Sequence, residues 1–282
     1  MQKIKNLTIP TTNQKPITLD IFFTENTQSP TIIYSHGFNG FKDWANFDLI
    51  AEQFVDAGFT FIKFNFSHNG TSPEQPEEFV DLEAYAQNNY TIELADLEKV
   101  IDWTLEENNP YKKAIDPDNL FLIGHSMGGG IVLVKASEDK RIKGVATWAS
   151  VGALTTPWTN WSAEKMAQWQ EKGVEYIKNS RTNQDMPLYY QLVEDFQTHK
   201  ERLNVESAVK KIQVPILLCH GTKDEAVPIE TASRLASLNN KASVFILVTD
   251  HVFGRKHPWR EIYLPDATQQ VVDKTIQFFK EL

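Results

Sequence analysis

A five-residue motif, Gly-x-Ser-x-Gly at residues 124–128, constrains the fold of this chain more than any other feature. An apolar run at residues 120–123 precedes the motif, and a helix-compatible run at residues 131–138 follows it. This order predicts a strand, a sharp turn and a helix, with Ser126 at the apex of the turn. Because such a turn crowds the backbone, the residues two before and two after the serine need to be nearly free of side chain. The motif therefore predicts a nucleophilic serine; the alternative is a glycine-rich turn with an idle serine.

The composition narrows the class of protein. The 282 residues fit one large domain, or a core domain with an insertion, and the hydrophobic fraction of 41% is enough for a packed core. The net charge is −9 and Lys and Arg do not cluster, which argues against nucleic acid and anionic membranes as partners. The apolar runs are too short to span a bilayer, and the first residues lack the apolar core of a secretion signal. We therefore expect a cytoplasmic protein.

Strands and helices are predicted to alternate along most of the chain. Such alternation is typical of a mainly parallel sheet covered by helices on both faces, with the active groups in loops beyond the carboxyl ends of the strands. Residues 73–88 are acidic and interpreted as irregular, and Asp266 is expected to cap the last helix. The predicted strands are residues 3–9, 17–23, 31–35, 60–66, 142–148, 214–219 and 243–248, and the predicted helices are residues 46–57, 90–107, 229–238 and a last one after residue 266.

The alternation breaks between residues 151 and 206, a segment too long for an ordinary loop. Two stretches in it, residues 162–178 and 186–202, are predicted to be helical. We interpret 151–206 as a helical lid inserted into a core domain formed by residues 1–150 and 207–282. The segment is rich in aromatic residues, and Trp158 and Trp161 are candidates for binding substrate. The alternative is that these aromatics form the insertion's own core.

A serine hydroxyl barely ionises at neutral pH, so it needs a base, and the base needs an acid to orient it. Asp224 is the candidate acid because it follows the strand that ends at Cys219. Glu225 in the same loop is the alternative acid, and a turn aspartate bonded to its own backbone is the alternative role for Asp224. The single cysteine, Cys219, is expected to fill core space, since one cysteine makes no internal disulfide and no metal cluster.

His251 is the candidate base, because it follows directly after the strand that ends at residue 248. His257 is the alternative. His125, beside the serine, is expected to pack or hydrogen-bond beneath the turn, and His199 in the insertion is expected to face solvent.

An oxyanion formed during attack on a carbonyl needs two amide donors. The N–H of Met127 is one candidate, since it begins the helix after the serine. The N–H of Phe38 is the other, because Gly37 before it permits a close approach of the backbone. His36 is expected to brace this loop, and His36 and Gly37 are also assigned to the substrate-binding region. The polar loop at residues 67–72 either borders the pocket or is a plain surface turn.

At these positions the chain resembles the α/β-hydrolase superfamily, and most closely the serine carboxylesterases related to feruloyl and cinnamoyl esterases and the dienelactone hydrolase-like group. The resemblance implies an eight-stranded sheet, a lid after the sixth strand, and a Ser–Asp–His mechanism without a metal ion. Dienelactone hydrolases proper use a cysteine nucleophile, and epoxide hydrolases and haloalkane dehalogenases use an aspartate, so Ser126 departs from all three. The matching stretches are residues 35–38, 65–72, 124–129, 220–227 and 250–253.

These observations predict a carboxylic ester hydrolase that forms an acyl-enzyme on Ser126, with a small-molecule ester as its partner, no cofactor and no metal ion. We expect a monomer or a homodimer. A serine peptidase or amidase of the aminopeptidase type and a thioesterase remain alternatives, because the same three residues serve all of these reactions. A hydrolase fold retained as a binding module is a further alternative.

Overall fold

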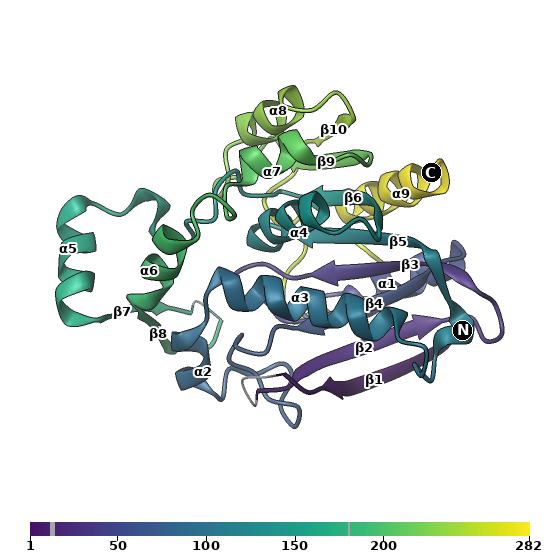
Figure 1. Cartoon of the computed structure of the whole chain (residues 1–282), viewed down its shortest axis with the longest axis horizontal. Helices are drawn as coiled ribbons and strands as arrows, with labels where there is room; N and C mark the ends of the chain where they lie inside the picture. Colours follow the sequence, from purple (N-terminus) through teal and green to yellow (C-terminus); the bar gives the residue numbers. More distant parts are fainter. Residues whose placement is uncertain (12–14, 180) are drawn as a thin grey trace.

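The computed structural model describes residues 1–11, 15–179 and 181–282. Within them, eight strands form one sheet, in the order β1–β2–β4–β3–β5–β6–β9–β10 (Figure 1). β1 pairs antiparallel with β2 and β2 antiparallel with β4, whereas all pairs from β4 to β10 are parallel. The mainly parallel sheet predicted from the sequence is therefore confirmed. The strands are β1 (Gln2–Ile9), β2 (Ile17–Phe23), β3 (Ser29–Ser35), β4 (Thr60–Asn65), β5 (Ile115–His125), β6 (Ile142–Trp148), β9 (Ile216–Gly221) and β10 (Ala242–Leu247).

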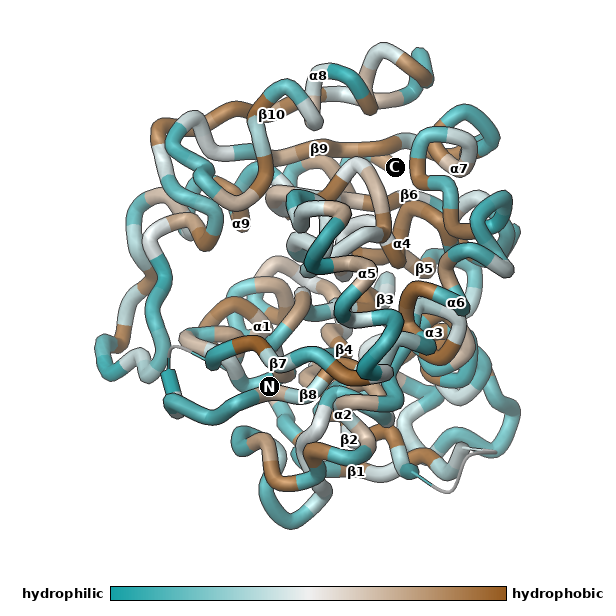
Figure 2. Tube along the Cα trace, turned by 90° about the vertical axis from the view of Figure 1, so that its left-hand side faces the viewer, coloured by the Kyte–Doolittle hydropathy of each residue, from teal (hydrophilic) through white to brown (hydrophobic). Residues whose placement is uncertain are grey.

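Helices cover both faces of the sheet, because successive side chains of a buried strand point to opposite faces. In β5, for example, Leu122 belongs to the apolar cluster beneath α3 (Tyr90–Leu105) and α4 (Met127–Glu138), whereas Ile123 belongs to the cluster beneath α1 (Phe47–Asp56) and α9 (Asp266–Lys280). The helices α7 (Val205–Lys211) and α8 (Glu230–Ser237) contribute to the first cluster. Figure 2 shows β9 as hydrophobic along its length, and Cys219 on this strand is a buried core residue, as expected.

Several local predictions need correction. The stretch interpreted as irregular contains a short helix, α2 (Leu82–Gln87), which begins where the Asp81 side chain accepts a hydrogen bond from Ala84 N–H at 3.0 Å. Asp266 does not cap α9, because Pro265 occupies the capping position. Asp266 lies in the first turn of the helix, where its negative charge interacts favourably with the helix dipole. Two 3₁₀ turns, η1 (Lys112–Ala114) and η2 (Trp158–Asn160), were also not predicted.

The segment 151–206 differs most from its prediction. Its first helix, α5 (Ala163–Lys172), ends early because Gly173 adopts the left-handed conformation (φ 73°) and its N–H bonds to Trp169 O at 2.9 Å. Two antiparallel strands follow, β7 (Val174–Lys178) and β8 (Asp185–Tyr189), and then α6 (Gln191–Thr198). The predicted helices over 162–178 and 186–202 are therefore wrong where the two strands of the hairpin, β7 and β8, take their place. Residue 180 lies outside the described residues. Figure 1 shows α5, α6 and the hairpin together at one end of the sheet, beside α2.

The aromatic residues of this segment pack on one another. Trp169 is fully buried, and its indole N–H donates to Leu188 O at 2.8 Å. The rings of Trp158 and Trp161 lie 5.9 Å and 5.2 Å from the Trp169 ring. The segment therefore has an aromatic core of its own. Among the described residues, no helix has the length and apolar character needed to cross a membrane.

Candidate active site

The serine turn has the strained geometry that the motif predicts. Ser126 lies between β5 and α4 with φ 55° and ψ −120°, a backbone conformation that non-glycine residues rarely adopt. A Cβ atom on Gly124 would lie 2.3 Å from Gly128 O, and one on Gly128 would lie 2.3 Å from His36 O. Both flanking positions therefore admit only glycine, and the turn packs directly against the loop that follows β3.

The candidate acid is fixed by four donors. One carboxylate oxygen of Asp224, Oδ1, accepts hydrogen bonds from Ala226 N–H (2.9 Å) and Val227 N–H (2.8 Å). The other, Oδ2, lies 2.8 Å from His251 Nδ1 and 3.2 Å from His220 Nε2. Burial by itself would raise the pKa of Asp224, but the hydrogen bonds from His220, His251 and Val227 hold this pKa well below its ordinary value. Asp224 is therefore ionised at neutral pH.

The candidate base lies in the turn after β10. The His251 ring donates to Asp224 through Nδ1, and its main-chain oxygen accepts a hydrogen bond from His125 Nε2 at 3.0 Å. With Nδ1 protonated, Nε2 of His251 is left as the basic nitrogen. His125 thus hydrogen-bonds to the loop that carries the candidate base, and it lines the same cavity as Ser126.

Ser126 and His251 line the same cavity, yet between these two described residues Ser126 Oγ makes no hydrogen bond to the His251 ring. Catalytic hydrogen bonds are often long or poorly aligned in ligand-free enzymes and tighten in the complex with substrate. The structure therefore places the Ser126 and His251 side chains in one cavity without a hydrogen bond between them.

The alternative residues lie elsewhere. His257 Nδ1 accepts a hydrogen bond from Ala45 N–H at 2.8 Å, and the His257 ring packs against Phe41 and Trp44. Glu225 is exposed, and in the described structure no hydrogen bond reaches its carboxylate. In the described structure His257 therefore makes no hydrogen bond to a carboxylate, and Glu225 makes none to a histidine.

The sequence did not predict the role of His220. This residue is buried at the end of β9, and its Nε2 lies 2.9 Å from Val227 O as well as 3.2 Å from Asp224 Oδ2. A ring N–H placed between these two oxygens holds the acid loop in shape. The four-residue spacing between His220 and Asp224 within one loop is the signal that was available.

The candidate oxyanion donors are the main-chain N–H groups of Phe38 and Met127. Among the described residues, neither Phe38 N–H nor Met127 N–H donates a hydrogen bond. The added Cβ of a substituted Gly37 would lie 3.0 Å from the Ser126 Cβ, so the loop at residues 36–40 approaches the serine closely. This loop, here called the oxyanion loop, and the first turn of α4 leave both amides free for a developing negative charge.

His36 braces the oxyanion loop. Its Nδ1 donates to Gly37 O at 2.9 Å, and its Nε2 lies 3.5 Å from the Asn69 side-chain amide. Burial lowers the pKa of His36 to about 4, so the ring is neutral at pH 7, with Nδ1 as donor and Nε2 as acceptor. The loop at residues 67–72 therefore supports the site through Asn69.

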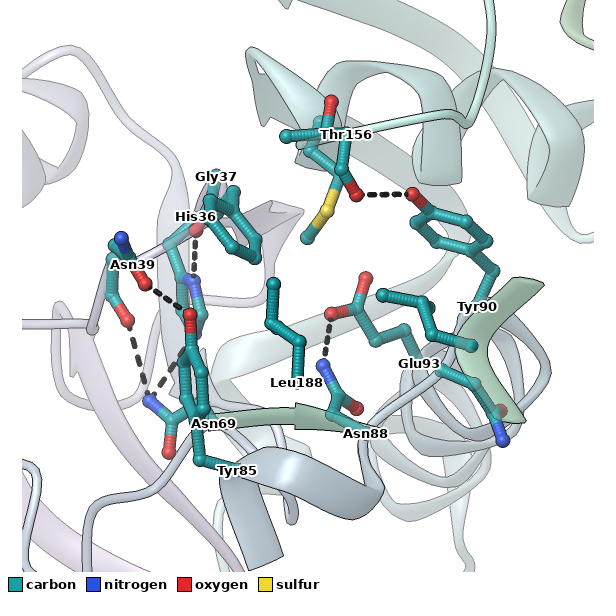
Figure 3. Close-up of a pocket in the computed structure, with 15 residues that line it drawn as sticks. His36, Gly37, Asn39, Asn69, Tyr85, Asn88, Tyr90, Glu93, Thr156 and Leu188 are labelled. Atoms are coloured by element: carbon teal, nitrogen blue, oxygen red, sulfur yellow. Dashed lines mark hydrogen bonds between the residues drawn. The ribbon is translucent and has the colours of Figure 1, made fainter. Parts of the chain in front are cut away.

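The oxyanion loop separates two cavities. The first has a volume of about 250 Å³ and is lined by Ser126, His251 and aromatic side chains of the Phe38 to Phe47 region. The second has a volume of about 20 Å³, includes Met127 and faces α2 and α3 (Figure 3). His36 and Gly37 line both cavities, whereas Trp158 and Trp161 are not among the residues that line either.

One group of acidic residues has the spacing of a metal site. Oxygen atoms of Asp20, Asp43 and Asp48 lie within 4.8 Å of one another. However, the Lys63 ammonium contacts all three carboxylates, and Lys42 contacts Asp20 and Asp43. The donor set is thus neutralised by lysines, which does not fit a resident cation.

The central strands of the sheet and the serine turn lie within a known family profile. A family profile described as the alpha/beta hydrolase fold matches residues 30–172, more than half of the chain. The chain belongs to the α/β-hydrolase family. In this α/β-hydrolase the candidate residues occur in the order Ser126, Asp224, His251, which is the order in which the fold presents its triad.

Individual relatives are distant. The α/β-hydrolase is 22% identical to the quorum-quenching protein AidA of Acinetobacter baumannii, over 92% of this chain and 88% of the relative. Its structure resembles that of Est1E from Butyrivibrio proteoclasticus with bound ferulic acid (TM-score 0.71, 18% identity, 98% of both chains). It also resembles a dienelactone hydrolase from Anabaena variabilis (TM-score 0.63, 15% identity, 99% of this chain and 97% of the other). At these identities the structural likeness shows the fold alone.

Proposed function

We propose that this α/β-hydrolase cleaves carboxylic esters through an acyl-enzyme on Ser126, with His251 as general base and Asp224 as its orienting acid. One observation carries the proposal. The 2.8 Å hydrogen bond between Asp224 Oδ2 and His251 Nδ1 fixes an imidazole whose other nitrogen is free, in the cavity that also holds the strained serine.

In the first half of the reaction, Ser126 Oγ attacks the acyl carbon and its proton passes to His251 Nε2. The carbonyl oxygen becomes an oxyanion, which the N–H groups of Phe38 and Met127 stabilise; each such donor is worth about 3 kcal/mol in the barrier. The C–O bond to the alcohol then breaks, and His251 returns the proton to the leaving oxygen.

In the second half, water takes the place of the alcohol. His251 removes one proton from the water as it attacks the acyl carbon, and the oxyanion forms again between the same two amides. When the bond to Ser126 breaks, the proton returns to Oγ and the carboxylic acid leaves. Asp224 stays ionised throughout, which stabilises the imidazolium that forms in each half.

The lining of the larger cavity is mixed: aromatic side chains form an apolar wall, and Asn39, Asn179 and Arg181 add polar groups. The side chains of Phe38, Phe41 and Trp44 line it together with the main chain of Gly37 and the bracing His36. We assign Trp158 and Trp161 a supporting role, as part of the aromatic core of the insertion 151–206 that forms the lid. The ferulic acid in the similar Est1E structure makes an aromatic acyl ester a reasonable member of the test panel.

The experiment compares the wild type with Ser126→Ala on p-nitrophenyl esters, a feruloyl ester, an aminoacyl anilide and a thioester. The proposal expects ester turnover that falls about 10⁶-fold in the variant, as loss of the nucleophile does in serine hydrolases. Ser233→Ala, an exposed serine on α8, is the matched control and should leave turnover unchanged. Wild-type ester turnover no faster than that of Ser126→Ala would refute the proposal, and faster turnover of the anilide would assign the triad to amides.

A further inference from the structure

The smaller cavity adjoins the place where an acyl group would be held. Met127 and Phe38, whose N–H groups are the candidate oxyanion donors, both line it, and so do His36 and Gly37 of the oxyanion loop. A carbonyl oxygen held by these two N–H groups therefore lies against residues that line the smaller cavity. At about 20 Å³, the space accepts one group the size of a water molecule.

Glu93 of α3 supplies the carboxyl group of the cavity. The residue is 2% exposed. Its Oε1 accepts a hydrogen bond from the Asn88 side-chain amide at 2.7 Å, whereas its Oε2 is buried and has no hydrogen-bond partner in the described structure. Figure 3 shows this second oxygen pointing into the space between Thr156, Leu188 and Tyr90. An unpaired buried oxygen of this kind costs free energy and calls for a partner.

The protonation state of Glu93 decides what that partner is. Burial raises the pKa of Glu93 to about 8, with a smaller lowering by Asn88 and a further rise from the nearby Asp96 carboxyl. The carboxyl therefore carries a proton at pH 7. Since Oε1 accepts from Asn88, the proton belongs on Oε2, which makes Glu93 a hydrogen-bond donor to whatever occupies the cavity.

Tyr90, one turn before Glu93 on α3, offers an acceptor beside it. The Tyr90 hydroxyl donates to Thr156 O at 2.7 Å, so its own oxygen retains lone pairs. Leu188, Leu192 and Met127 add apolar lining, and Asn39, Asn69 and Asn89 add polar lining. A donor at Glu93 and a neighbouring acceptor at Tyr90 match a hydroxyl group, which accepts one hydrogen bond and donates another.

We propose that this cavity is an acyl subsite in which Glu93 recognises a hydroxyl group on the acyl part of the substrate. The preferred substrates are then esters of short hydroxy acids. This inference rests on the esterase function proposed above and adds a substrate class to it.

The test measures kcat/KM for p-nitrophenyl butyrate and for its derivatives with a hydroxyl on carbon 2, 3 or 4. The wild type should favour at least one hydroxylated ester by about tenfold or more. Glu93→Leu should remove that preference, mainly through a higher KM for the hydroxylated ester. Glu93→Gln, whose amide can still donate, should retain part of it. Glu98→Gln, on the exposed side of the same helix, is the matched control and should keep the wild-type preference.

Three results would overturn the inference. The wild type could show no preference for any hydroxylated ester, which is expected if the cavity holds only an ordered water. Glu93→Leu could lower turnover of all four esters equally, which would assign Glu93 a structural role. In addition, calorimetric titration of Ser126→Ala with the methyl esters measures the subsite without hydrolysis; equal affinity for methyl butyrate and its hydroxylated forms would also overturn it. If the wild type cleaves none of the esters, the proposed function fails, and the calorimetric comparison still decides the subsite.

Discussion

The carboxylate of Asp224 lies 2.8 Å from the imidazole of His251, although 27 positions separate them in the chain. Their strands explain the proximity. β9 and β10 are parallel neighbours, with Gly221 paired to Leu247, so the loops that follow the two strands leave the same edge of the sheet (Figure 1). A Cβ on Gly221 would lie 2.3 Å from Thr249 O, so only glycine permits the two loops to approach this closely.

Replacing the acid should leave the fold intact and remove most of the activity. We expect Asp224→Asn to lower kcat by about 10⁴-fold, because an amide no longer stabilises the imidazolium or selects the correct tautomer. Steady-state kinetics on a p-nitrophenyl ester measure the loss. Glu225→Gln, in the same loop but exposed, is the control and should match the wild type. A large loss in Glu225→Gln with full activity in Asp224→Asn would exchange the two assignments.

His220 is a positioning residue in this account, because it contacts Asp224 and not the substrate. His220→Phe removes the ring N–H that lies between Asp224 Oδ2 and Val227 O, and kcat should fall about tenfold with KM nearly unchanged. His220→Gln, which retains a donor, should recover part of the loss. If KM rises while kcat is preserved, or if Gln and Phe behave alike, the positioning role is wrong.

The oxyanion loop can be displaced without removing a functional side chain. A Cβ on Gly37 would lie 3.0 Å from Ser126 Cβ and 3.1 Å from His125 O, so Gly37→Ala should push the Phe38 N–H away from the serine. We expect kcat to fall about 10²-fold, the typical effect of losing one oxyanion donor. Phe38→Ala keeps its N–H and should change KM more than kcat. Equal kcat in Gly37→Ala and the wild type would show that this loop does not supply the donor.

The buried ion network beside β2 and β4 should govern stability in acid. Lys63 is fully buried and contacts Asp20 at 3.2 Å, as well as Asp43 and Asp48. Burial would raise the pKa of Asp43, but Lys63 and Lys42 lower this pKa below its ordinary value of 3.8. A lowered folded-state pKa stabilises the fold at pH values above the unfolded pKa, and the contribution fades as the pH falls from about 5.

Removing the central lysine of this network tests that dependence. Lys63→Met should lower the free energy of unfolding by about 3–5 kcal/mol at pH 7, because three carboxylates then share only Lys42 and the partly exposed Lys5. Urea unfolding measures this loss, and the gap to the wild type should narrow at pH 4. Lys143→Met, an exposed lysine on β6, is the control and should be neutral. A gap of the same size at both pH values would contradict the assignment.

The sequence predicted those parts of the structure that depend on local backbone demands. Gly124 and Gly128 are required by the serine turn, and the strand–helix alternation gave both the sheet and the strand ends where Asp224 and His251 lie. These features follow from short-range sterics and hydrophobic periodicity, and both can be read from a single chain.

The rest depended on tertiary contacts. Gly173 ends α5 and starts a hairpin whose β8 packs on α2, a partner that lies far away in sequence. The spacing of aromatic residues in the insertion does not show whether Trp158 lines a substrate pocket or packs in the core of the insertion, because both roles need the same side chains. The sequence places Glu93 only within the predicted helix 90–107, since neither its burial nor its unpaired oxygen can be read from the residue order.

The central claim is that Ser126 is a nucleophile activated by His251. Its most direct test is reaction of the folded protein with a fluorophosphonate, followed by peptide mass spectrometry and measurement of the labelling rate. The account predicts a single adduct, on Ser126, that forms much more slowly in His251→Ala. Rapid labelling in His251→Ala, or an unlabelled Ser126 in protein that still hydrolyses esters, would contradict it.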